Sequence, residues 1–70
     1  MDYALFRARL RTARLRANLS QAALAAKIET YQPYVSALER GTRVQLKAET
    51  FLKLAQALDV SPGWLAGEEG

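Results

Sequence analysis

The sequence predicts an all-α fold of five short helices. Along most of the chain, apolar residues recur every three or four positions, which is the period of an amphipathic helix. No segment alternates apolar and polar residues as a half-buried strand would. Residues that end or cap helices, such as Ser20, Gly41 and Ser61, stand between the periodic segments. With 70 residues, the chain is expected to form one domain, residues 1–70, around a small core.

The first helix is predicted from about residue 3 to residue 17. Its apolar stripe consists of Tyr3, Phe6, Leu10, Ala13 and Ala17. Five arginines occupy most of the remaining positions, and Asn18 can adopt the left-handed conformation that ends a helix. This arginine-rich segment could by composition lie on a membrane surface, but its apolar stripe is needed to complete so small a core.

The second and third helices are predicted at about 20–28 and 32–40, with a break of about three residues between them. Ser20 is a favourable N-cap, Pro33 suits a first helical turn, and Gly41 suits a helix end. The expected buried positions are Leu24, Ala25, Ile28, Val35 and Leu38. Two helices joined so closely cross steeply, and the first turn of the second helix then projects from the body.

The fourth helix is predicted at about 47–58, and its apolar stripe consists of Phe51, Leu54, Ala55 and Leu58. Ser61 and Pro62 read as the cap and first residue of a short fifth helix at about 61–66. The polar segment from Gly67 to Gly70 is expected to fray.

Composition restricts the function. The chain has no Cys and no His, so disulfides and the usual zinc or imidazole chemistry are excluded. No nucleophile–base pair is evident, so we expect neither an enzyme nor a cofactor nor a metal site. No apolar run approaches the length of a membrane span, no secretory signal is visible, and no small-molecule site is evident. We therefore expect a cytoplasmic protein.

The charge is unevenly distributed along the chain. Residues 1–45 carry eight Lys or Arg against three acids, whereas residues 46–70 carry two basic residues against four acids. A basic first part fits a polyanionic partner, although a solvated basic surface fits equally well. The projecting third helix favours the polyanion. The major groove of DNA accepts a helix, and the amide of Gln32 matches the adenine edge.

The segments LSQAALAAKI and YVSALERG, at their spacing here, resemble the helix-turn-helix of the phage repressor and Cro (XRE) family. The segments LRTAR and LKLAQALDVSPGWL extend the resemblance over nearly the whole chain. The resemblance implies a compact lambda-repressor-like domain of five helices, with the helix-turn-helix formed by helices two and three. It also implies that the third helix lies in the DNA major groove.

The resemblance implies a role for particular residues. Base contacts are expected from Gln32, Pro33, Ser36, Ala37 and Arg43. Phosphate contacts are expected from Gln21, which would also brace Gln32, and from Tyr34 and Arg40. Among the arginines of the first helix, we expect a phosphate contact only from Arg11. Arg14 and Glu39 match a family ion pair, and loss of one partner would cost about 3 kcal/mol.

Three positions depart from the family pattern. Glu29 replaces the usual glycine of the turn and would carry about 1 kcal/mol of strain if the backbone keeps a positive φ. Tyr31 replaces a small capping residue, for which Thr30 could substitute. Pro33 can contact bases only by van der Waals packing.

The expected function is sequence-specific binding of double-stranded DNA by a transcriptional regulator, in particular a repressor, on a palindromic operator. The dimer would form in solution or only on DNA, through contacts that include Trp64 and Val60. The alternative is a protein-interaction module of the same fold, such as an antitoxin or a scaffold partner. Bound to chromosomal DNA, the regulator would be associated with the nucleoid.

Overall fold

The computed structural model describes residues 1–69, and five α-helices account for most of them. They are α1 (Tyr3–Arg16), α2 (Gln21–Lys27), α3 (Gln32–Arg40), α4 (Ala48–Ala57) and α5 (Pro62–Leu65). Each helix begins and ends within one residue of its predicted bounds, and the all-α fold is confirmed. Gly70, the last residue of the predicted domain, lies outside the described residues. Within residues 1–69, no helix combines the length and apolar character needed to span a membrane.

Local capping interactions explain these boundaries. The Ser20 hydroxyl accepts a hydrogen bond from the Ala23 N–H (2.9 Å), and Ser61 caps α5 in the same way. Asp2, which the sequence did not single out, caps α1 by accepting from the Leu5 N–H (3.1 Å). Gly41 ends α3 in the left-handed conformation. The predicted left-handed conformation of Asn18 is also confirmed, with φ of 59°.

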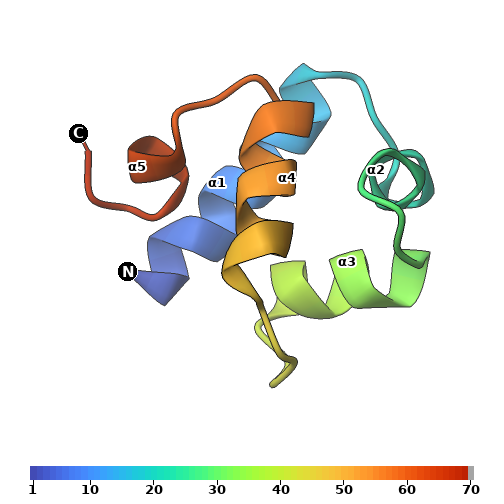
Figure 1. Cartoon of the computed structure of the whole chain (residues 1–70), viewed down its shortest axis with the longest axis horizontal. Coiled ribbons are helices and arrows are strands. Elements are labelled where there is room, and N and C mark those ends of the chain that lie inside the picture. The colour runs from blue at the N-terminus through green and yellow to red at the C-terminus, as the bar shows by residue number, and fades with distance from the viewer. Residues whose placement is uncertain (70) are drawn as a thin grey trace.

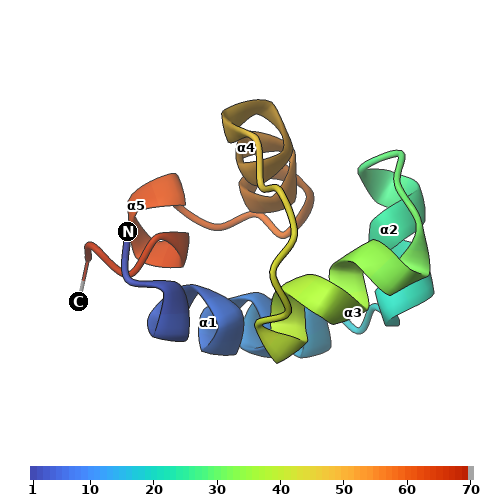
Figure 2. The same ribbon diagram turned by 90° about the horizontal axis from the view of Figure 1, so that it is seen from below.

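The helices pack into a body of about 28 × 25 × 20 Å. Helix α1 packs against α3 and α5, while α4 also packs against α5. Figure 1 and Figure 2 both show α2 and α5 at opposite ends of the molecule, with α4 between them. The α2–α3 pair therefore stands at one end, and the short α5 stands at the other end with the N-terminus.

The core contains most of the apolar residues that the helical period predicts. Its fully buried side chains come from all five helices: Phe6, Leu10, Leu24, Val35, Leu54 and Leu65. The predicted stripe of α1 is wrong at both ends, because Tyr3 is 63% exposed and Ala17 is also exposed. Arg14 is buried on this helix instead, at 7% exposure. The buried face of α1 thus includes a charged residue that the apolar stripe did not predict.

The segment from Gly67 to Glu69, which was expected to fray, is instead held against the body by hydrogen bonds. The Glu69 carbonyl accepts a hydrogen bond from Arg9 (2.8 Å), and its carboxylate accepts from the Ser61 hydroxyl (3.0 Å). The Asp2 N–H also donates to the Ala66 carbonyl (2.9 Å). The bonds from Arg9 and Asp2 join the two ends of the chain, which local polarity alone could not reveal.

Candidate nucleic-acid interface

The turn between α2 and α3 keeps a left-handed residue although it has no glycine. Glu29 adopts φ of 60°, so the expected strain of about 1 kcal/mol is present at this position. The Thr30 N–H donates to the Ala25 carbonyl (2.8 Å), which closes the end of α2. Figure 1 shows α2 nearly end-on beside the first turn of α3, which lies across the view. The steep crossing predicted for the two helices is therefore present.

The first turn of α3 is exposed and lacks a side-chain cap. Tyr31 occupies the N-cap position without a capping hydrogen bond, and its side chain is 81% exposed. Its carbonyl accepts from the Tyr34 N–H (3.0 Å) and from the Val35 N–H (3.4 Å). Gln32 and Pro33, both exposed, follow at the start of the helix. The polar tip that the sequence predicts is open to solvent.

The predicted ion pair between Arg14 and Glu39 is confirmed. The Arg14 Nε lies 2.6 Å from Glu39 Oε2, and the Arg14 terminal nitrogen Nη2 lies 3.0 Å from Oε1. The remaining terminal nitrogen of Arg14 donates to the Leu19 carbonyl (2.9 Å). The hydrogen bond to Glu39 raises the pKa of Arg14 and outweighs the lowering effect of its burial. The pair joins α1 to the end of α3 through two parallel hydrogen bonds.

A chain of hydrogen bonds continues from this ion pair to the exposed tip of α3. The Gln21 Nε2 donates to Glu39 Oε1 (3.2 Å), and the Gln32 Nε2 donates to Gln21 Oε1 (2.7 Å). The predicted bracing of Gln32 by Gln21 is confirmed, whereas the bond from Gln21 to Glu39 was not predicted from the sequence. We call these four residues, Arg14, Glu39, Gln21 and Gln32, the polar relay.

Ser36 and Arg40 lie one turn apart on α3 and contact each other. The Arg40 guanidinium donates to the Ser36 hydroxyl (2.9 Å). Arg40 is exposed and Ser36 is partly exposed, so both remain accessible to a partner. Because the hydroxyl accepts from arginine, its own proton is directed away from Arg40 and can be donated outward.

Two predicted contact residues are used inside the molecule instead. Ala37 is only 6% exposed, so its methyl group offers almost no surface to a base. The Tyr34 hydroxyl donates to the Gln45 carbonyl (2.6 Å), so its proton is not available to a phosphate, which can only accept. Burial also raises the pKa of Tyr34. Tyr34 therefore fastens the loop after α3, and neither residue is retained among the proposed contacts.

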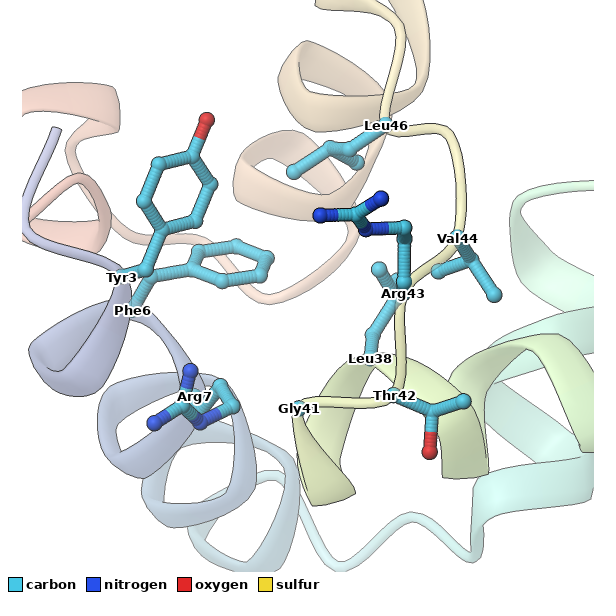
Figure 3. A pocket seen from close by; sticks show the side chains of 9 residues that line it. All are labelled: Tyr3, Phe6, Arg7, Leu38, Gly41, Thr42, Arg43, Val44 and Leu46. Carbon is cyan, nitrogen blue, oxygen red and sulfur yellow. The ribbon is translucent and has the colours of Figure 1, made fainter.

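Arg43 lies on the loop after α3, beside a surface pocket of about 530 Å³. The apolar lining of this pocket comes from α1, α3 and the loop, and includes Phe6, Leu38 and Leu46. Figure 3 shows the Arg43 side chain extending over the pocket toward Leu46 and Phe6. Arg43 is exposed, so its guanidinium is accessible from outside while its stem follows the apolar surface.

The remaining predicted residues lie elsewhere on the molecule. Arg11 is exposed on α1, as a phosphate contact would require. Trp64 and Val60, the predicted dimer contacts, are both partly buried and pack against the core. The Arg9 guanidinium lies 4.9 Å from the centre of the Trp64 ring, an interaction that the sequence did not indicate.

Comparison with known proteins agrees with this geometry. A family model described as helix-turn-helix matches residues 10–65. A solved structure, the P22 c2 repressor protein in complex with synthetic operator 9T in the presence of Tl⁺, is similar at a TM-score of 0.84 and 29% sequence identity. The similarity covers 93% of this chain and 97% of that chain. No match is found among curated proteins. Because the family model spans more than half of the sequence, the chain belongs to the helix-turn-helix family of the phage-repressor (XRE) type, whose members are DNA-binding transcription regulators.

Proposed function

We propose that this chain is a transcriptional repressor that binds a palindromic operator as a homodimer, with one α3 helix in each of two successive major grooves. The similarity to the P22 c2 repressor, solved with a synthetic operator, supports operator binding. Occupation of an operator near a promoter would exclude RNA polymerase by steric hindrance. A regulator of this kind acts on DNA at the nucleoid.

The exposed, braced tip of α3 is the observation on which this proposal depends. Gln32 projects into solvent, and its hydrogen bond to Gln21 fixes its amide before any partner arrives. A fixed amide loses less conformational entropy when it binds, and it presents one pattern of donor and acceptor to the base pairs. Pro33 and Ser36 extend this surface by packing contacts and by a hydroxyl donor.

Three exposed arginines and Gln21 supply the contacts to the DNA backbone. Arg40 and Arg43 lie at the end of α3 and just beyond it, Arg11 lies on α1, and Gln21 begins α2. Each neutralised phosphate releases condensed counterions, so affinity is expected to fall steeply as salt rises. Arg43 would contact either a base or the backbone.

The homodimer would form through the α5 end of the molecule, where Trp64 and Val60 lie on or near α5. A palindromic operator requires two copies related by two-fold symmetry, spaced by about one helical turn of DNA. Sedimentation of the protein on a full operator tests this arrangement. One protomer on a duplex that carries both half-sites would contradict the dimer and leave DNA binding untouched.

Selection of binding sites from random duplex DNA, followed by affinity measurements on the selected site, tests the function. We expect an enriched palindrome, and we expect Gln32→Ala to weaken specific binding by about 1–3 kcal/mol while non-specific binding is unchanged. The matched control is Gln56→Ala, an exposed glutamine on α4 that should leave both affinities unchanged. Failure to enrich any sequence would contradict the regulator function.

A further inference from the structure

In the polar relay, each amide donates toward Glu39: Gln32 donates to Gln21, and Gln21 donates to Glu39. We propose that Glu39 is a positioning residue that makes Gln32 prefer adenine over guanine, although Glu39 itself does not touch DNA. The proposal rests on the proposed function and deepens it, because it names a residue outside the DNA-contacting surface that sets the base preference of Gln32.

The first step is the carboxylate of Glu39. Its side chain is 5% exposed and lies against the Arg14 guanidinium at 2.6 Å. Both of its oxygens accept hydrogen bonds from Arg14, Oε2 from Nε and Oε1 from Nη2, and a carboxylate has no hydrogen to donate in return. Any amide that contacts Glu39 must therefore turn its NH₂ group toward it.

The second step is the amide of Gln21, which has a donor and an acceptor on opposite sides. Its Nε2 donates to Glu39 Oε1 at 3.2 Å, and its Oε1 then faces Gln32. A rotation of this amide by 180° would bring two acceptors together at Glu39, and the bond would become repulsive. The charge on Glu39 thus fixes which side of Gln21 meets the tip of α3.

The third step is the amide of Gln32. Because Gln21 presents an oxygen, Gln32 must donate from Nε2, and the two atoms lie 2.7 Å apart. The groups that remain for a partner are its Oε1 and its second N–H. Gln32 is exposed, so both remaining groups are accessible at the start of α3.

This remaining pair of groups distinguishes the two purines. In the major groove, adenine presents the N7 acceptor and the N6 amino donor, which match one N–H and one carbonyl oxygen. Guanine presents two acceptors, N7 and O6, so the Gln32 oxygen would face O6 without a hydrogen between them. An amide that was free to turn could direct both N–H groups at guanine, but the bond to Gln21 occupies one of them.

Two variants interrupt the relay at different points. Glu39→Gln replaces the carboxylate by an amide of similar shape, which can donate or accept and so imposes no direction on Gln21. Gln21→Ala removes the link but leaves the Arg14–Glu39 pair intact, so it remains informative if Glu39→Gln fails to fold. Gln21 is also a proposed phosphate contact, so its loss lowers affinity for every sequence, and the readout is therefore a ratio.

The measurement is the ratio of dissociation constants for two duplexes that differ only by A·T or G·C at one position. That position is the one at which Gln32→Ala abolishes the sequence preference. For the unaltered chain we expect adenine to be favoured about 5- to 150-fold, and for both variants we expect this ratio to fall below about 3-fold. Leu58→Ala is the control: it removes a buried side chain of the core that makes no hydrogen bond to the relay, and its ratio should stay unchanged.

The possible failures are distinguishable. If the unaltered chain shows no preference for any sequence, the proposed function and this inference both fail. If the chain prefers adenine and the preference survives in both variants, only the role of Glu39 is overturned. An equal loss in Leu58→Ala would also overturn it. NMR spectra of the free protein test the relay without DNA: the Gln32 side-chain NH₂ resonances should shift in Glu39→Gln and Gln21→Ala, and unchanged resonances would contradict the relay.

Discussion

Arg14 and Arg9 both lie on α1 and connect it to opposite ends of the molecule, Arg14 through an ion pair with α3 and Arg9 through backbone carbonyls and an aromatic ring near α5. Arg14 is buried and meets a carboxylate through two parallel bonds at the α3 end. Arg9 is partly exposed and donates to the carbonyls of Trp64 and Glu69 at the α5 end, with its guanidinium over the Trp64 ring. Neither bond of Arg9 involves a second charge.

The difference follows from the solvent around each group. A guanidinium removed from water needs a full opposite charge to compensate for its lost hydration, whereas a partly exposed one keeps water and needs only dipoles and a ring face. The α3 end therefore holds its geometry by an interaction that fails when one partner is lost. The α5 end holds its geometry by several weaker contacts that fail gradually.

The largest expected effect comes from breaking the buried pair. Glu39→Ala leaves the Arg14 charge buried without a partner, and we expect the free energy of unfolding to fall by about 3–5 kcal/mol. Urea denaturation measures this loss, and a double-mutant cycle with Arg14→Ala isolates the coupling between the two residues. A coupling near zero would contradict the ion pair as the support of the α3 end.

The corresponding change at the other end should be milder. Arg9→Ala removes two hydrogen bonds to carbonyls and the contact with the Trp64 ring, and we expect a loss of about 1–2 kcal/mol. The same denaturation experiment compares the two variants directly. If Arg9→Ala destabilised the chain as much as Glu39→Ala does, burial would not explain the difference between the two ends.

The turns at the two ends also differ. The helix-turn-helix places Glu29 at φ of 60°, while the α5 end places Gly67 at φ of 79°. We expect Glu29→Gly to relieve strain and stabilise the fold by about 0.5–1 kcal/mol, after allowance for the greater freedom of glycine when unfolded. The control is Asn18→Gly, which should gain less because asparagine adopts this conformation more readily. A loss of stability in Glu29→Gly would show that its side chain contributes more than its backbone costs.

The smallest expected effect concerns Tyr34 and appears only in alkaline solution. Burial raises the pKa of Tyr34, so in the unfolded chain this hydroxyl ionises first, near its ordinary value of 10.0. The stabilisation is complete below pH 10 and is lost as pH rises through the higher folded value. We expect the stability of Tyr34→Phe to decline less steeply above about pH 10 than that of the unaltered chain. Urea denaturation at a series of pH values measures this. An equal loss of unfolding free energy above pH 10 in the two chains would contradict the prediction.

The helix boundaries could be predicted because they depend on local chemistry. Ser20 and Ser61 cap their helices with their own hydroxyls, and Gly41 ends α3 by its own backbone conformation. Burial along α1 was predicted less well. The helical period places Tyr3 and Ala17 on the apolar stripe, but only the packing of α3 and α5 decides which turns of α1 are covered.

For the candidate interface, the sequence predicted contacts within the molecule better than it predicted which side chains are accessible to a partner. Ala37 and Tyr34, both expected as DNA contacts from the family pattern, are engaged within the molecule. The Arg14–Glu39 and Gln21–Gln32 contacts were predicted, whereas the bond from Gln21 to Glu39 depends on how the start of α2 packs against the end of α3. A signal for the burial of Ala37 was present in the sequence. Ala37 lies three residues after Tyr34, so the two share a face of α3, and Tyr34 packs against the core.

The α5 end also brings the two ends of the chain together, since the Met1 amino group lies 3.7 Å from the Glu68 carboxylate. Figure 2 shows this end on the opposite side of the molecule from α2 and the first turn of α3. An affinity handle or a fluorophore fused at either terminus would therefore lie away from the proposed DNA-contacting surface, but beside Trp64 and Val60, the proposed dimer contacts.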